Sequence, residues 1–456
     1  MLDLVISGAT IVTAGGVFAG TVGIEAGRIA AVVAPGIDLT ANEHIDAAGL
    51  HLFPGAIDPH VHLRIGGMSF AETCERETRS LIAGGITSAL VFTEAPHRSY
   101  HDVLPDRIAA IGQSSYCDLA LHPMIQSLAH ADEIVSIAER FGVRSFKLYF
   151  AGGGRELYPE TFAVDDGVMF AAFRAIAQIG SPALAMVHAE NWEVAAMLQR
   201  SLEAAGRTDA AAWSESKPAF VEEEPVRRAA FYARQAGCPL YVVHVSSGPG
   251  ARAIGELAAA GQAVTGESCP HYLAIDCHDE RAVLAKYNPS VKEASDREAL
   301  WAALGSGVLQ CVGSDHIPLR WADKQAGGFD TIWTARGGVP GGATILPLLL
   351  RDGYHAGRLS LPQIAAISSA NPARLFGLSA RKGAIAPGYD ADLVLVDLDR
   401  TLTFDPALLQ VDFSLFTGEA WRGWPVATFI GGQRVMQDGE IVGQPGIGHY
   451  LARPLA

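Results

Sequence analysis

Six side chains of the kinds that bind metal ions or transfer protons stand in or just after short apolar segments. They are His60, His62, Lys147, His188, His244 and Asp315. His60 and His62 are two residues apart, so on an extended strand they share one face, where two imidazoles suit metal coordination. A lone His-x-His pair is more often ordinary surface or core histidine. Six candidate ligands in five predicted strands are hard to obtain by chance, so the set predicts a metal centre.

Lys147 is the sharpest anomaly, because it interrupts the apolar run SFKLYF between Phe146 and Leu148. A bare ammonium inside a protein core is costly. One interpretation is that the amine reaches solvent or pairs with an acid. The other is that it has reacted with CO₂ to form a carbamate, whose two oxygens can bridge two cations. Beside four histidines and an aspartate we favour the carbamate.

Asp315 also has two interpretations, a structural helix cap or a metal ligand that doubles as a proton carrier. The neighbouring His316 would point the other way on a strand end, so it is not predicted as a ligand. His271 could line the same pocket, and Glu190 and Asn191 are predicted as supporting partners or helix caps.

Eight apolar runs position these residues. They are HLFPGAID, ITSALVF, CDLALHPMI, SFKLYF, ALAMVHAE, LYVVHVSS, AVTGESCP and LQCVGSDH. Amphipathic segments that often end in glycine separate them, which is typical of a parallel sheet. Eight such strands predict an α/β fold, a (β/α)₈ TIM-like barrel with its site at the strand ends. An open doubly wound sheet is the alternative, and no G-x-G-x-x-G follows the first strand to support it.

The two ends of the chain have a different texture, with short β-like runs between glycines. We predict that residues 1–51 and 381–456 form the two parts of one small β-sandwich, and that residues 52–380 form the barrel. Two independent edge hairpins are the alternative.

Composition excludes several classes of protein. The chain has 456 residues, of which 49% are apolar and 18% charged, and its net charge is −15. A disordered chain is excluded, and an acidic protein is a poor binder of nucleic acid or of an anionic membrane. We find no signal peptide and no apolar run of spanning length. Six scattered cysteines without a CxxC pair predict reduced thiols and a cytoplasmic protein.

Several motifs in order carry a resemblance to a known family. PGAIDPHVHL, SFKLYF, MVHAEN, VVHVSS, ESCPHYL and GSDHIP resemble the cyclic amidohydrolases of the amidohydrolase superfamily, the group of hydantoinases, dihydropyrimidinases, allantoinases and dihydroorotases. The terminal GAIAPGYDADLVLVD is similar to the family's small β-sandwich.

The resemblance implies a dinuclear centre with two divalent ions, zinc or manganese. His60 and His62 would hold one ion, His188 and His244 the other, and carboxylated Lys147 would bridge them. Asp315 would complete the first site and act as acid and base. The resemblance also implies a homo-oligomer, either a dimer or a tetramer.

Substrate residues give mixed signals. Hydantoinases place a tyrosine five residues after the bridging lysine, where this chain has Gly152. Arg64, Asn288 and the segment GGVPGGATILPLLL with Gly338 look more like dihydroorotases, so these three residues are predicted to bind substrate. Leu319 stands where that branch has a histidine. The Gly-rich stretch 151–160 is predicted as a lid from which Arg155 and Tyr158 could reach the substrate.

The expected reaction is hydrolysis of a small cyclic amide, ureide or imide. A hydroxide between the metals attacks the carbonyl, and Asp315 moves its proton to the leaving nitrogen. The favoured hypothesis is hydantoinase or dihydropyrimidinase activity, and the alternative is dihydroorotase or allantoinase activity. Two further hypotheses are a non-catalytic dihydropyrimidinase-related interaction protein and an enzyme of different chemistry, such as a deaminase or open-chain amidase. No ligand is missing, which argues against the non-catalytic protein.

Overall fold

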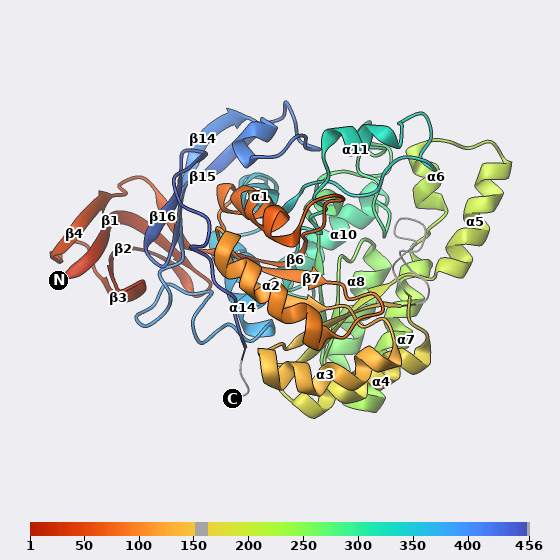
Figure 1. Ribbon diagram of the computed structural model, residues 1–456. Helices are drawn as coiled ribbons and strands as arrows, with labels where there is room; N and C mark the ends of the chain where they lie inside the picture. Colours follow the sequence, from red (N-terminus) through yellow and green to blue (C-terminus); the bar gives the residue numbers. More distant parts are fainter. Residues whose placement is uncertain (151–162, 454–456) are drawn as a thin grey trace.

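The eight apolar runs form the parallel strands of one barrel in the computed structural model, which describes residues 1–150 and 163–453 (Figure 1). Strands β6, β7 and β8 make one ladder, and β9 to β13 make another. Parallel bridges from Met124 to Lys147 and from Val61 to His316 join the two ladders on both sides. The barrel is therefore closed, which confirms the (β/α)₈ prediction and excludes the open sheet. The strands are β6 (Ala56–His62), β7 (Ile86–Thr93), β8 (Asp118–Pro123), β9 (Ser145–Phe150), β10 (Leu184–Ala189), β11 (Leu240–Val242), β12 (Val264–Ser268) and β13 (Cys311–Val312).

Helices surround the barrel, and neighbours in the sequence pack against one another. Local signals explain where they begin and end. Ser69 and Glu72 form a reciprocal capping box at the start of the first helix. Gly142 ends the third helix with a left-handed φ of 67°. The outer helices are α1 (Phe70–Ala83), α2 (Tyr100–Ser114), α3 (Leu128–Phe141), α4 (Asp166–Ile179), α7 (Phe220–Ala236), α8 (Gly248–Ala259) and α10 (Ala294–Gly305).

Shorter helices fill the connections after the later strands. Between β10 and α7 lie α5 (Trp192–Ala204) and α6 (Ala210–Glu215). The connection after β12 contains α9 (Pro270–Ala274), and the one after β13 contains α11 (Trp321–Ala326). A helical run then leads out of the barrel. It consists of a 3₁₀ turn (Gly342–Thr344), α12 (Ile345–Leu348), a π-helical segment (Leu349–His355), α13 (Leu361–Ala365), a second π-helical segment (Ala366–Ala370) and α14 (Asn371–Leu375).

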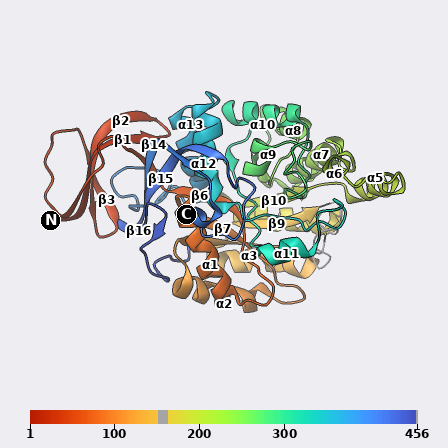
Figure 2. The ribbon, with the colours of Figure 1, turned by 90° about the horizontal axis from the view of Figure 1, so that it is seen from above.

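Both ends of the chain contribute to one nine-stranded sheet beside the barrel (Figures 1 and 2). β5 joins the two contributions, because it pairs in parallel with β1 and antiparallel with β14. The sheet has its own apolar core, with Ile6, Ile11 and Leu393 among its buried side chains. Its strands are β1 (Leu2–Thr13), β2 (Gly16–Glu25), β3 (Arg28–Val33), β4 (Ala41–Asp46), β5 (His51–Pro54), β14 (Leu393–Thr403), β15 (Ala420–Ile430), β16 (Gln433–Gln437) and β17 (Glu440–Ile441), with a 3₁₀ turn at Pro406–Leu409.

The end of the chain returns to the barrel. After β17 the described segment leaves the sheet and pairs with barrel strand β8. Leu119 donates to His449 O at 2.9 Å, and Leu451 donates back to Leu119 O at 2.8 Å. The buried Arg453 bonds Ser145 Oγ at 2.7 Å. Polar contacts of this kind, far apart in sequence, leave no local pattern from which the tail's course could be predicted.

A buried ion cluster ties the amino end of barrel strand β8 to the sheet domain. Lys382 Nζ contacts carboxylate oxygens of Asp118, Asp390 and Asp392, and its side chain is 3% exposed. Burial disfavours the ammonium, but the attraction of Asp392 and Asp118 outweighs it and raises the pKa of Lys382.

Lys382→Ala should therefore destabilise the fold by about 3–5 kcal/mol, because it leaves the buried carboxylates of Asp118 and Asp392 without their cation, while Asp390 keeps Arg381 at 2.9 Å. Urea unfolding followed by circular dichroism measures the change. Arg28→Ala is the matched control, since Arg28 is half exposed and lies 3.8 Å from Asp390; it should cost less than about 1 kcal/mol. A Lys382→Ala chain as stable as this control would contradict the assignment.

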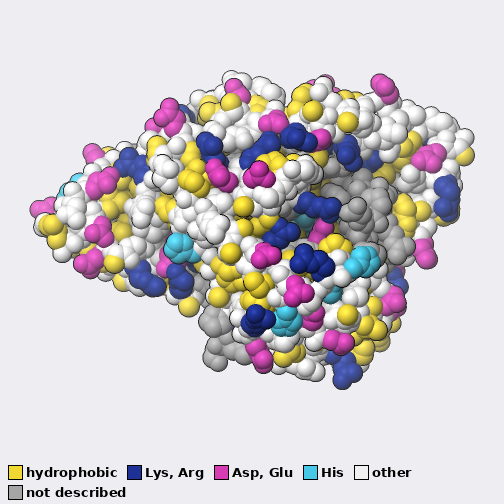
Figure 3. Space-filling view, in the orientation of Figure 1, with side chains coloured by type: hydrophobic (Ala, Val, Ile, Leu, Met, Phe, Trp, Pro, Cys, Tyr) yellow, Lys and Arg dark blue, Asp and Glu magenta, His cyan; other side chains and the backbone are white. Residues whose placement is uncertain are grey.

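The surface carries mixed charge. Figure 3 shows Lys and Arg side chains around a hollow near the middle of one face, with Asp and Glu side chains between them and over the rest. Within residues 1–150 and 163–453, no helix combines the length and apolarity needed to cross a membrane. The six cysteines are all buried and free of disulfides.

Candidate active site

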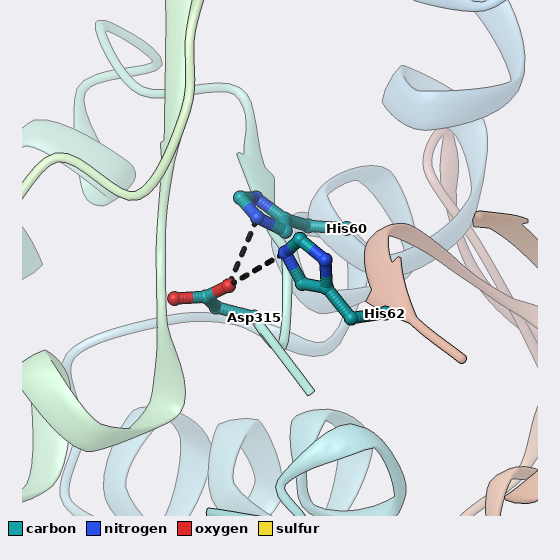
Figure 4. Close-up of side chains that lie close together, drawn as sticks. All are labelled: His60, His62 and Asp315. Carbon is teal, nitrogen blue, oxygen red and sulfur yellow. Dashed lines mark ion pairs between the residues drawn. The ribbon is translucent and has the colours of Figure 1, made fainter. Parts of the chain in front are cut away.

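The two histidines of β6 lie close to an aspartate that follows β13, the neighbouring strand with which β6 closes the barrel. His60 Nε2 lies 3.0 Å and His62 Nε2 3.4 Å from Asp315 Oδ1 (Figure 4). Asp315 follows β13 with a left-handed φ of 48°, a conformation that costs free energy outside glycine and often marks functional sites. One ligand atom from each of the three residues falls within 4.8 Å of the others, so they could hold one metal ion.

Neighbouring groups keep the Asp315 side chain ionised. Asp315 is buried, and burial by itself raises a carboxyl pKa. The charge and hydrogen bonding of His60 and His62 outweigh burial and hold the pKa of Asp315 well below its ordinary value. The group is therefore a carboxylate at neutral pH, able to bind a cation or to accept a proton.

The other two histidines lie beside this group. His188 ends β10 and His244 follows β11, and His188 Nδ1 is 2.9 Å from His244 Nε2. The ring centroids of His60 and His244 are 5.2 Å apart. All four predicted histidines thus gather at the carboxyl end of the barrel, where strand ends converge.

Lys147 completes the cluster from β9. Its side chain is fully buried, and its Nζ has no hydrogen-bond partner among the described residues. The nearest groups include the rings of Phe92 and Tyr149, whose centroids lie 4.7 and 5.1 Å from Nζ. Burial lowers the pKa of Lys147 to about 7, although Asp315 and Glu267 act in the opposite direction. An amine without a bonded acid and with this pKa has a large uncharged fraction at neutral pH, the form that reacts with CO₂.

Two buried acids that the sequence interpretation missed support the ligands. Asp58 accepts hydrogen bonds from the backbone N–H of His60 and of Ser314, both at 3.0 Å. Glu267 contacts His60 Nδ1 and accepts from Tyr241 Oη at 2.8 Å. Both acids lie inside apolar strands. The criterion that identified Lys147, a charged residue within an apolar run, would therefore have identified them as well.

The predicted substrate residues have different surroundings. Arg64 is 66% exposed at its side chain, and its Nη1 lies 2.8 Å from Glu94 Oε2. Asn288 is buried. Gly338 has a φ of 88°, and a Cβ there would lie 2.6 Å from Ile317 Cβ, so only glycine fits.

The remaining predicted residues near the site differ in the groups that they contact. His271 is buried and stacks on Tyr287 with ring centroids 3.7 Å apart, and burial lowers the pKa of His271 to about 3. His316 Nε2 lies 2.8 Å from Glu77 Oε2, a partner outside the ligand set. Glu190 is buried with Oε2 3.5 Å from His188 Nε2, and Asn191 caps α5. Leu319 is partly buried against the core. Gly152, Arg155, Tyr158 and the predicted lid lie outside the described residues.

The closed barrel and the histidine-rich cluster at its strand ends place the molecule among (β/α)₈ proteins that use the carboxyl-end face. A profile of the amidohydrolase family matches residues 51–435. An allantoinase from Solibacter usitatus is 35% identical over 463 positions, which cover 100% of this chain and 98% of the relative. The chain belongs to the amidohydrolase family.

Further similarity extends over the whole length. An L-hydantoinase from Paenarthrobacter aurescens is 32% identical and covers 99% of this chain and 98% of its own. The solved L-hydantoinase (dihydropyrimidinase) from Arthrobacter aurescens superposes with a TM-score of 0.91 at 32% identity, covering 99% of both chains. A dihydropyrimidinase from Brevibacillus agri gives a TM-score of 0.90 at 30% identity, over 100% of this chain and 99% of that one. The terminal sheet is thus part of the shared fold.

Proposed function

We propose that this protein hydrolyses a C–N bond in a small cyclic amide or ureide, with two divalent ions at the strand ends. The single observation that supports this most is the convergence of four histidines, an aspartate and a buried lysine at one end of the barrel. The names of its relatives, an allantoinase and an L-hydantoinase, support cyclic ureides as the substrate class.

The residues fit the metal ions. His244 Nδ1 and Lys147 Nζ are buried polar atoms without a hydrogen-bond partner in the described part of the chain. Buried polar atoms of this kind call for an ion, a water or a catalytic role. An imidazole-rich set with one carboxylate suits zinc first and manganese second. His60, His62 and Asp315 would hold one ion, and His188 and His244 the other. Carboxylated Lys147 would bridge them.

The ions, when bound, supply Lewis acidity and a water made acidic enough to attack a carbonyl at neutral pH. The chain supplies the rest. Asp315 accepts a proton at Oδ1 from the attacking water and passes it to the ring nitrogen that leaves. Asn288 orients the ring by hydrogen bonds, whereas the Gly338 N–H already donates to Lys286 O at 2.8 Å and the Gly338 carbonyl accepts from Lys324 Nζ at 2.8 Å. The product is an open-chain acid.

Substrate choice follows from the partner of Arg64. Because Glu94 already pairs with this guanidinium, we expect neutral rings such as hydantoin, dihydrouracil and allantoin to be hydrolysed faster than the carboxylated ring of dihydroorotate. Steady-state kcat/KM over this panel, followed by loss of ring absorbance, measures the preference.

Arg64→Ala tests the alternative directly. We expect it to change kcat/KM by less than about threefold for every neutral ring, because a solvent-exposed ion pair contributes little. A selective loss of dihydroorotate hydrolysis in Arg64→Ala, with neutral rings unaffected, would instead make Arg64 a carboxylate receptor and support dihydroorotase-type activity.

We also propose a homo-oligomer, a dimer or a tetramer, on the strength of the family resemblance. A cytoplasmic location is proposed because six buried cysteines stay unpaired. Light scattering on the purified protein measures the oligomeric state.

A further inference from the structure

Glu267 in β12 is a buried carboxylate that touches both halves of the histidine cluster. Its side chain is 0% exposed. Oε1 contacts the ring Nδ1 of His60 and lies 3.3 Å from the backbone N of His244. Oε2 accepts the phenolic O–H of Tyr241 at 2.8 Å. One carboxylate therefore meets a predicted ligand of each metal.

The fold leaves room for this carboxylate only because residue 313 is glycine. A Cβ on Gly313 would lie 2.7 Å from Glu267 Cδ and 2.8 Å from His60 Cβ. Real Cβ atoms do not approach other atoms so closely, and both neighbours are fully buried. Gly313 on one side and Tyr241 on the other thus confine the Glu267 carboxylate to a single position.

The contact with His60 selects one form of the imidazole. A carboxylate accepts hydrogen bonds, so it holds the ring proton on Nδ1. The lone pair is then on Nε2, the nitrogen that faces Asp315 at 3.0 Å. Carboxylate partners of this kind orient metal-binding histidines and make the ring a stronger donor.

The contact with His244 acts on the backbone. His244 has a left-handed φ of 40°, which a residue with a Cβ rarely adopts. The bond from its N–H to Glu267 stabilises this conformation, which aims the ring toward His188. Loss of the carboxylate would therefore disturb a ligand of the second metal as well.

We propose that Glu267, confined by Gly313 and Tyr241, is a positioning residue that fixes the metal-binding form of His60 and the backbone of His244 together, and so couples the affinities of the two metal sites. This inference rests on the proposed dinuclear centre. It predicts that one neutral substitution weakens both ions, not only the one beside His60.

The test is a zinc titration of the full-length apoprotein in its native oligomer, against a competing chelating dye. We expect the parent chain to bind two zinc ions and Glu267→Gln to bind both more weakly, by about 10–100-fold at the His60 site, in keeping with losses of such partners. Tyr241→Phe should act in the same direction with a smaller effect. The visible spectrum of the cobalt-loaded variant should also change, because the geometry at His60 is altered.

Glu77→Gln is the matched control. Glu77 is likewise a buried glutamate bonded to a histidine, but its partner His316 is outside the ligand set. Zinc affinity and cobalt spectrum should match the parent in this variant, with all melting temperatures measured alongside. If Glu267→Gln does not fold, Tyr241→Phe decides.

Two failures are distinguishable. A parent chain that binds no zinc would overturn the dinuclear centre and the proposed function with it. A parent chain with two ions, and Glu267→Gln and Tyr241→Phe that bind both with unchanged affinity and spectrum, would overturn the role of Glu267 alone. Weakening of only one ion would overturn the coupling.

Discussion

Lys147→Ala is expected to lose ring hydrolysis and most of its bound metal. In the proposed centre, the carbamate on Lys147 would serve both ions, so its removal would leave each ion with fewer ligands. Metal ions contribute several kcal/mol to such reactions, which corresponds to a loss of kcat on the order of 10³-fold or more. Initial rates with allantoin or hydantoin and metal analysis of the same sample measure both effects.

Chemical rescue sharpens this test. The truncated side chain leaves a buried space, and a short carboxylate such as formate or acetate can occupy it and bridge two cations. We expect partial recovery of activity when zinc and the carboxylate are added together. Lys147→Arg is the control that keeps a positive charge and cannot form the carbamate, so it should stay inactive. Full activity in the alanine variant without any additive would defeat the carbamate.

Asp315→Asn is expected to show the second large effect. The amide keeps the size of the side chain but neither binds a cation strongly nor accepts a proton at neutral pH. Loss of a positioned proton carrier lowers kcat by about 10²–10⁴-fold. Circular dichroism should remain that of the parent, and metal analysis reports how much of the first ion is retained.

The matched control for this prediction is Asp323→Asn on α11. Its side chain is 34% exposed and pairs with Arg320, away from the ligand set, so kcat should be unchanged. An Asp315→Asn enzyme that keeps more than a tenth of the parent kcat would show that another group carries the proton.

Much of the site could be predicted from the sequence, because the order of strands along the chain determines which residues lie at the carboxyl end of a parallel barrel. Residues at the carboxyl ends of different strands must converge at one end, so His60, His188 and Asp315 could be grouped without knowledge of a single distance. Lys147 could be predicted by a different argument, because a charged residue within an apolar strand is rare unless it has a special role. Barrel closure and the shared terminal sheet could also be predicted.

The rest depends on contacts that no local pattern encodes. The pairing of Arg64 with Glu94, which changes the expected substrate, joins residues from the ends of two different strands. The path of the tail to Leu119 and the cluster around Lys382 are likewise set by tertiary packing. Glu267 belongs to the motif ESCPHYL, but its role could be inferred only from its contacts with His60 and Tyr241 in the structure.

The position of β5 between β1 and β14 has a consequence for biosynthesis. The first five strands leave the ribosome early, yet the partner of the β5 edge begins at Leu393. At about 5–20 residues per second, that partner follows on the order of tens of seconds later. During this interval the nascent chain presents an unsatisfied strand edge, a template for association with other chains. Translation speed and chaperone supply therefore bear on the yield of this protein, and premature termination before β14 leaves the edge permanently open.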